Sequence, residues 1–300
     1  MSGPFFLLTE DLMNFNKTAK TIDEQIQKLK DRNLIIEDEK SAKEILFSIN
    51  YYNFSGYLFD YRKQDGTYSD VSFEKVYKIY KCDERIKSLL LYAIELIEHN
   101  LRTKLSYRIA HLTSPSGYCD SCNFNDIINH KKLMQKFDKA VIRNKNLPFV
   151  KHHLIKYNGF FPVWVAVELF SLGMILNCYK NLKTPIRKAI AKDFNTGVNQ
   201  LSNWIECTSY LRNLSAHYMR LYNFNIQKTP MRCKKNSPNF VNTYKLYDII
   251  YIMRFLIPDK KEWNNYILPG IEHIFTEYND AISISAYGFP DNWQSDLYIN

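Results

Sequence analysis

Apolar residues recur at helical spacing along most of the chain. The longest run predicts a helix over 72–112, one face of which carries Ile86, Leu90, Ala93, Ile97, Leu101, Leu105, Ile109 and Leu112. Shorter runs predict two helices near the start, at 20–32 and 39–49, and two near the end, at about 241–256 and 261–279. The pattern therefore predicts an all-α fold.

Two further helices are predicted in the middle of the chain. One begins at Pro162 and extends to about Tyr179, and we expect it to be packed on all sides because apolar residues surround it. The other spans about 198–221. The stretch from 51 to 70 contains an Asp-Gly-Thr turn signal, which predicts an irregular or briefly extended connector.

Three charged residues lie close to predicted apolar faces. Glu98 and Arg102 are four residues apart beside the 72–112 stripe, and we expect them to pair at the edge of the core. Glu168 lies in the apolar helix after Pro162, where a carboxylate is costly unless it meets a cation or hydrogen-bond donors. It is either a structural residue, in a buried pair or facing water at a boundary, or it orients an arginine at an active site.

The composition agrees with a folded, helical chain. Of its 300 residues 46% are hydrophobic, which is ample for a core. Nine glycines and ten prolines are too few for a turn-rich β fold, and no Gly-rich phosphate loop is present. The formal net charge of +9 favours anionic partners, because Lys and Arg release counterions when they neutralise phosphates.

Basic residues are concentrated from 119 to 160, a polar and weakly periodic segment, and recur near 187 and 232. They form either a solvated face or contacts with nucleic acid. The candidates for RNA binding are Lys131, Lys132, Arg143, Lys145, Lys151, Arg187, Lys188, Arg232, Lys234 and Lys235.

The sequence predicts a cytoplasmic protein that is not embedded in a membrane. Its first residues lack a basic start and reach Glu10 and Asp11 after a short apolar run, so they make a poor signal peptide. The most apolar segment, 160–176, is too short for a membrane span. Only Cys119 and Cys122 have metal-like spacing, so we expect reduced thiols and neither a metal nor a cofactor.

The stretch "SYLRNLSAHYMRLYN", residues 209–223, carries the candidate chemistry. Cleavage of RNA by the neighbouring 2′-hydroxyl needs a base, an acid for the leaving 5′-oxygen, and positive charge at phosphorus. Histidine suits either proton transfer, and arginine presents a charged planar fork to phosphate oxygens. In such a site His217 would act as general acid or base, Arg212 would clamp the phosphate with Arg220 in support, and Asn213 would orient the ribose or the imidazole. Taken alone, the spacing also fits a histidine satisfied in the core or a surface salt bridge.

One histidine cannot easily stand on both sides of one phosphorus. A symmetric homodimer would supply two histidines and two arginines around the same phosphate. Ser215 and Ala216 would let a partner helix or a nucleic-acid backbone come close, although small residues are also simply tolerated at such positions.

Four ordered segments resemble the Abi-like abortive-infection family of bacteria, which includes the AbiD and AbiF types. They are "INYYNFSGYLF" (49–59), "VYKIYKCDERIKSLLLYAIELIEHNLRTKLSYRIA" (76–110), "FPVWVAVELFSLGMI" (161–175) and "LSNWIECTSYLRNLSAHYMRLYN" (201–223). The resemblance runs from about residue 20 to 225. Ser215 departs from the family pattern, where Cys is frequent, and Phe224 stands where a basic residue is common.

This resemblance implies relation to the HEPN superfamily, whose helical domains dimerise and often cleave RNA without metal through an R-x4-6-H motif. On this chain the motif falls on Arg212, Asn213 and His217, with Glu98, Arg102 and Glu168 as supporting residues. It implies a HEPN-like core at 71–225 with a basic insertion near 119–160, flanked by an N-terminal region (1–70) and C-terminal helices (226–300). Phage defence by growth arrest is implied too, as is association with a structured non-coding RNA in relatives of the AbiF type.

Two other interpretations of the 209–223 motif remain open. In the first, the same residues grip RNA phosphates without cutting, as in a non-catalytic RNA-binding module. In the second, the motif is part of a dimer interface only.

Overall fold

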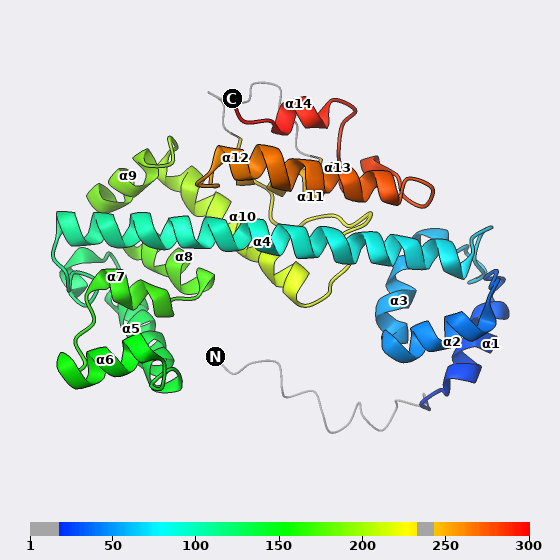
Figure 1. Cartoon of the computed structure of the whole chain (residues 1–300), viewed down its shortest axis with the longest axis horizontal. Helices are drawn as coiled ribbons and strands as arrows, with labels where there is room; N and C mark the ends of the chain where they lie inside the picture. Colours follow the sequence, from blue (N-terminus) through cyan, green and yellow to red (C-terminus); the bar gives the residue numbers. More distant parts are fainter. Residues whose placement is uncertain (1–17, 233–242) are drawn as a thin grey trace. The chain divides into compact units, whose positions relative to one another are not determined.

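The computed structural model describes residues 18–232 and 243–300, and it confirms the all-α fold. Within these residues the chain contains helices and isolated β-bridges but no strand or sheet (Figure 1). No helix among them combines the length and the apolar character needed to cross a bilayer. The chain divides into two compact units, residues 1–80 and 81–300, which are described separately below.

The first unit contains short helices fixed by capping side chains. They are α1 (Ile22–Lys30), α2 (Glu39–Ser48), α3 (Tyr51–Tyr57) and the 3-10 turn η2 (Phe59–Tyr61). The two predicted N-terminal helices are confirmed, and Thr21 forms a capping box with Glu24 at the start of α1. The predicted connector over 51–70 is wrong in its first part, because the Asn50 side chain caps Tyr52 N–H and starts α3 there.

The second unit is built around the long helix α4 (Phe73–Leu112), which begins in the first unit and confirms the longest predicted helix. Its other α-helices are α5 (Ile127–Arg143), α6 (Pro148–Lys156), α7 (Val163–Ala166), α8 (Leu172–Asn181), α9 (Thr184–Lys192), α10 (Val198–Ala216), α11 (Leu246–Met253), α12 (Lys260–Glu262), α13 (Leu268–Glu277) and α14 (Trp293–Leu297). The stripe of α4 is buried from Ile86 to Ile109, and only its last member, Leu112, is exposed.

The apolar helix predicted from Pro162 to Tyr179 is not continuous. It divides into α7, the 3-10 turn η4 (Val167–Leu169) and α8. The chain extends at Phe170, with φ −81° and ψ 128°, and the Ser171 side chain then accepts the N–H of Met174 and starts α8. The apolar pattern predicted one helix because it contains no information about the cap that Ser171 provides.

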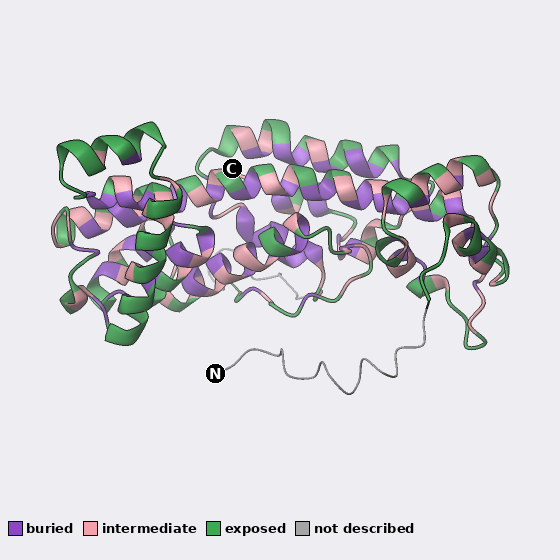
Figure 2. Cartoon of the chain, turned by 90° about the horizontal axis from the view of Figure 1, so that it is seen from below, coloured by how far each residue is buried: buried purple, intermediate pink, exposed green. Residues whose placement is uncertain are grey.

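The core of the second unit draws on α4, α8, α10, α11 and α13. α10 packs against α8, α9 and α11, and α5 packs against α8 and η4. Every residue of α11 is buried, and Asn100 on α4 donates to the Leu256 carbonyl oxygen just beyond it. The C-terminal helices therefore share the core with α4 and α10. In contrast, most side chains on α6 are exposed (Figure 2).

Candidate functional site

The 209–223 motif lies at the C-terminal end of α10. The helix was predicted to continue to about residue 221 but ends at Ala216, so Arg220 lies on the turn that leaves the helix. The backbone conformation ends the helix, because Tyr218 adopts φ +55°. The N–H of Tyr218 donates to the Ser215 carbonyl oxygen at 3.3 Å, and the N–H of Met219 donates to the Leu214 carbonyl oxygen at 2.9 Å. A left-handed residue followed by such bonds closes the helix.

Three of the predicted catalytic side chains point away from the core. Arg212, Asn213 and His217 are exposed, whereas the neighbouring Leu211 and Leu214 are buried. The side chains of Asn213 and His217 make no hydrogen bond to any described residue. The imidazole is therefore open to solvent, to a ligand or to a second copy of the chain.

The small residues of the motif face the chain's own α4. Ser215 is only 3% exposed, and its Oγ has no hydrogen-bond partner among the described residues. A pocket of about 410 Å³ beside it is lined by Glu84, Arg85, Lys87, Ser88, Leu91, Ser215, Ala216 and Tyr218. Ser215 is therefore buried toward α4, whereas Ala216 is partly exposed.

A buried ion pair holds the turn that follows His217. Asp83 accepts the N–H of Leu221 and the hydroxyl of Tyr287, each at 2.7 Å, while the Lys87 ammonium donates to the Met219 carbonyl oxygen at 3.1 Å. The Lys87 Nζ lies 3.7 Å from the Asp83 carboxylate, and both side chains are at most 5% exposed. Burial lowers the pKa of Lys87, and the Asp83 charge opposes that effect.

Asp83 and Lys87 are not among the residues predicted from the sequence. The only signal was an acidic and a basic residue four apart on α4, a pattern that most helices use on exposed faces. Nothing in that spacing says that the pair is buried, because the groups that cover it come from residues 219–221 and from Tyr287.

A second cluster gathers around Arg102. Its guanidinium Nη2 donates to Glu98 at 2.5 Å and to the Phe170 carbonyl oxygen at 2.8 Å, and Nη1 lies 3.9 Å from Glu168. The predicted pairing of Glu98 with Arg102 is thus present. Glu168 does meet an arginine, but it does so from the turn η4 with its side chain 44% exposed, so it is not a carboxylate enclosed by an apolar helix.

Arg212 connects α10 to this cluster. Burial raises the pKa of Glu98, and the positive charges of Arg102 and Arg212 both act against that rise. Arg212 is therefore close enough to Glu98 for a direct electrostatic interaction. The fold brings Glu98, Arg102, Glu168 and Arg212 together from α4, η4 and α10, while His217 and Arg220 lie at the end of α10 and beyond it.

The Arg212–Glu98 interaction has a measurable consequence. An Arg212→Gln substitution removes a charge that lowers the pKa of Glu98, so we expect that pKa to rise. Carboxyl ¹³C NMR during a pH titration measures the change. Because the folded-state pKa of this carboxyl is already raised, its stabilising contribution is present at low pH and declines as the pH rises through that pKa. The Arg212→Gln variant should lose more stability than the wild type over this range.

Arg220→Gln is the matched control, since Arg220 is not among the charges that shift the pKa of Glu98. Equal pKa values of Glu98 in wild type and Arg212→Gln would contradict the proximity of Arg212 to this cluster.

The predicted RNA-binding residues are scattered over the surface. The exposed ones are Lys131, Lys132, Arg143, Lys145, Lys151, Lys188 and Arg232. Arg187 is half-buried, donates to Ser202 Oγ at 3.1 Å and lies over the ring of Tyr179, so its guanidinium is already engaged within the fold. Lys234 and Lys235 lie outside the described residues.

Cys119 and Cys122 are exposed free thiols. Across residues 18–232 and 243–300, no group of three or more His, Cys, Asp or Glu side chains is arranged to hold a metal ion. Two thiols alone do not complete the four ligands of a structural zinc site.

Comparison with curated proteins and with solved structures gave no match. A family model described as Abi-like protein matches residues 44–223. This range covers more than half of the 300 residues and includes Glu98, Arg102, Glu168 and the α10 motif. The chain therefore belongs to the Abi-like family.

Proposed function

We propose that this protein is a bacterial abortive-infection effector that binds RNA and cleaves it without metal, as a HEPN-type endoribonuclease. The observation that carries the proposal is the exposed set of Arg212, Asn213 and His217 at the end of a helix whose leucines are anchored in the core. The side chains of Asn213 and His217 make no hydrogen bond to any described residue, and they lie with Arg212 on one helix end. Polar groups held on a rigid element in this way are what a binding or catalytic site requires.

The chemistry follows from these groups. The 2′-oxygen of the ribose attacks phosphorus, and its proton goes to a base. The bond from phosphorus to the 5′-oxygen breaks as an acid protonates that oxygen. His217 takes one of these proton transfers, and the guanidinium of Arg212 stabilises the charge that accumulates on the phosphate oxygens. Glu98, which is paired with Arg102 on α4, attracts Arg212 and so orients it.

A homodimer completes the site, because each chain brings a single histidine in this motif. Two copies related by a two-fold axis would place one imidazole on the attacking side and the other on the leaving side of one phosphate. Tyr218 and Met219, beside the motif, are exposed by 59% and 50%, which supports contact with a partner surface here.

The wider role rests on family membership and on charge. Belonging to the Abi-like family supports phage defence by growth arrest in the bacterial cytoplasm. The net charge of +9 and the exposed lysines of α5 and α6 support RNA as the partner, a structured non-coding RNA among them.

Cleavage in EDTA tests the proposal. We expect the purified protein to cut single-stranded RNA with metal chelated and to leave 2′,3′-cyclic phosphate ends, because attack by the 2′-oxygen forms that ring. A DNA oligonucleotide of the same sequence is the matched control and should stay intact, since it has no 2′-hydroxyl. Mass spectrometry of the products identifies the ends.

Two outcomes would contradict cleavage by the metal-independent mechanism. Linear phosphate ends that require added metal indicate a different mechanism. RNA that is bound tightly yet stays intact, with or without metal, indicates the non-catalytic binding module, whose Arg212 and His217 hold phosphate without proton transfer.

A further inference from the structure

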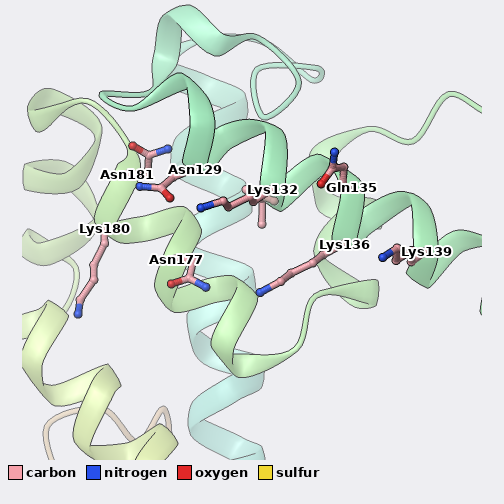
Figure 3. A pocket seen from close by; sticks show the side chains of 9 residues that line it. Asn129, Lys132, Gln135, Lys136, Lys139, Asn177, Lys180 and Asn181 are labelled. Carbon is pink, nitrogen blue, oxygen red and sulfur yellow. The ribbon is translucent and has the colours of Figure 1, made fainter. Parts of the chain in front are cut away.

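A second candidate site lies between α5 and α8, on elements that do not carry the α10 motif. It is a pocket of about 430 Å³ (Figure 3), which is lined by Asn129, Lys132, Leu133, Gln135, Lys136, Lys139, Asn177, Lys180 and Asn181. Its volume falls within the range of small-molecule and nucleotide sites. The close view shows Lys132 and Lys136 extending from α5 toward α8, where Asn177 lies, whereas Lys180 extends away from them.

The walls of this pocket are fixed by hydrogen bonds. Asn181, 8% exposed at the end of α8, accepts the N–H of Asp126 and donates to its carbonyl oxygen, each at 2.8 Å. Asp126 in turn caps the first N–H groups of α5. Leu133, which is 4% exposed, supplies an apolar floor. The start of α5 is thus held to the end of α8 by hydrogen bonds within the chain.

The charge in the pocket has one sign. Lys132, Lys136 and Lys139 follow each other at spacings of four and three, which places them on one face of α5, and Lys180 adds a fourth ammonium from α8. No carboxylate lines the pocket. Lys180 pairs with Glu206 at 2.6 Å, but the three α5 lysines form no ion pair with any described residue. Like charges at this spacing destabilise a helix, so the fold itself does not need them there.

Neutral donors and acceptors stand beside the lysines. The carboxamides of Gln135 and Asn177 are exposed and make no hydrogen bond within the described residues. Asn129 donates to Asp126 Oδ2 at 2.8 Å and keeps its amide oxygen available. Ammonium groups for phosphate oxygens, together with carboxamides for hydroxyl or base edges, match the chemistry of a nucleotide.

We propose that the α5–α8 pocket binds the phosphate groups and ribose of a nucleotide, and that this nucleotide belongs to a single strand of RNA. The lysines neutralise successive phosphates, and Gln135 and Asn177 contact the sugar or base. The pocket would hold RNA away from the scissile bond and position the strand relative to α10. The identity of the ligand rests on the proposed function, whereas the pocket and its charge do not.

The test compares two triple variants with equal charge change. The pocket variant carries Lys132→Gln, Lys136→Gln and Lys139→Gln. Its control carries Lys40→Gln, Lys63→Gln and Lys261→Gln, three exposed lysines that are neither RNA-binding candidates nor part of the pocket lining. Glutamine keeps the helix propensity of lysine, so both proteins should fold as the parent does, which circular dichroism verifies. His217→Ala is the common parent, so that the probe stays intact.

Binding of a fluorescein-labelled 12-nucleotide RNA is measured by anisotropy over a range of salt concentrations. We expect the pocket variant to lose affinity on the order of 10-fold or more and its log–log salt slope to flatten by about 2, because three phosphate contacts are lost. The control should lose about 3-fold or less. A second probe, ATP, distinguishes a strand of RNA from a free nucleotide as the ligand. If the pocket variant loses ATP binding but keeps its RNA affinity, the pocket binds a free nucleotide.

Equal losses in the two triple variants would overturn the proposal, since they would show that RNA binding follows overall charge. Parent protein that binds neither probe would overturn it too. These binding results do not depend on the nuclease proposal. If that proposal fails, the protein with His217 leaves RNA uncut, but the affinities of the two triple variants stay the same.

Discussion

RNA cleavage should fall by at least about 100-fold when His217 is replaced by alanine, with RNA affinity retained. The imidazole supplies a proton transfer that no neighbouring side chain can take over, because Asn213 has no titratable proton and arginine stays protonated throughout the working range. Growth arrest on expression of the protein should be lost as well. The measurement is a single-turnover cleavage rate at saturating protein, together with anisotropy for binding.

Stability provides the first control for this variant. His217 is exposed, caps α10 and has φ −99°, a conformation that alanine adopts without strain. We therefore expect the free energy of unfolding to change by no more than about 0.5 kcal/mol. His273→Ala is the matched control on a side chain that is 78% exposed, and it should cleave RNA normally. An unchanged cleavage rate in His217→Ala would show that His217 is not the general acid or base.

The buried pair beside the motif should dominate stability. Asp83→Ala leaves the Lys87 ammonium buried without its counter-charge and deprives Leu221 N–H and the Tyr287 hydroxyl of their acceptor. Breaking a buried pair in this way costs about 3–5 kcal/mol. Urea unfolding followed by tryptophan fluorescence measures the loss in the second unit, because all four tryptophans lie within residues 81–300.

Glu84→Ala is the matched control for Asp83→Ala. Glu84 is the next residue on α4, and its ion pair with Lys81 is about one-third exposed, so its removal should cost less than about 1 kcal/mol. Combining Asp83→Ala with Lys87→Met removes both charges and should recover part of the loss, since no unpaired charge remains. Hydrogen exchange of the 217–223 peptide should rise in Asp83→Ala. Similar costs for Asp83→Ala and Glu84→Ala would rule out a structural role for the pair.

Local sequence patterns accounted for most of the helices. The apolar stripe of α4 and the capping box of α1 are encoded within a few turns of chain, so they could be read directly from residue spacing. The break in the helix after Pro162 could not be read in this way. The Ser171 side chain starts a new helix there, and Glu168 lies partly exposed on the 3-10 turn before it, beside Arg102. The end of α10 was also misplaced, since nothing around Tyr218 in the sequence signals a left-handed backbone.

The candidate site divides in the same way. Residue types and spacing predicted the Glu98–Arg102 pair and made Arg212, Asn213 and His217 candidates for RNA chemistry, whereas the resemblance to the Abi-like family was needed to favour a catalytic role. Only the tertiary structure joined Arg212 to Glu98, held the turn after His217 with Asp83 and Lys87, and closed the lysine pocket between α5 and α8. These relations connect residues far apart in the chain, and burial and electrostatic proximity exist only once the helices have packed together.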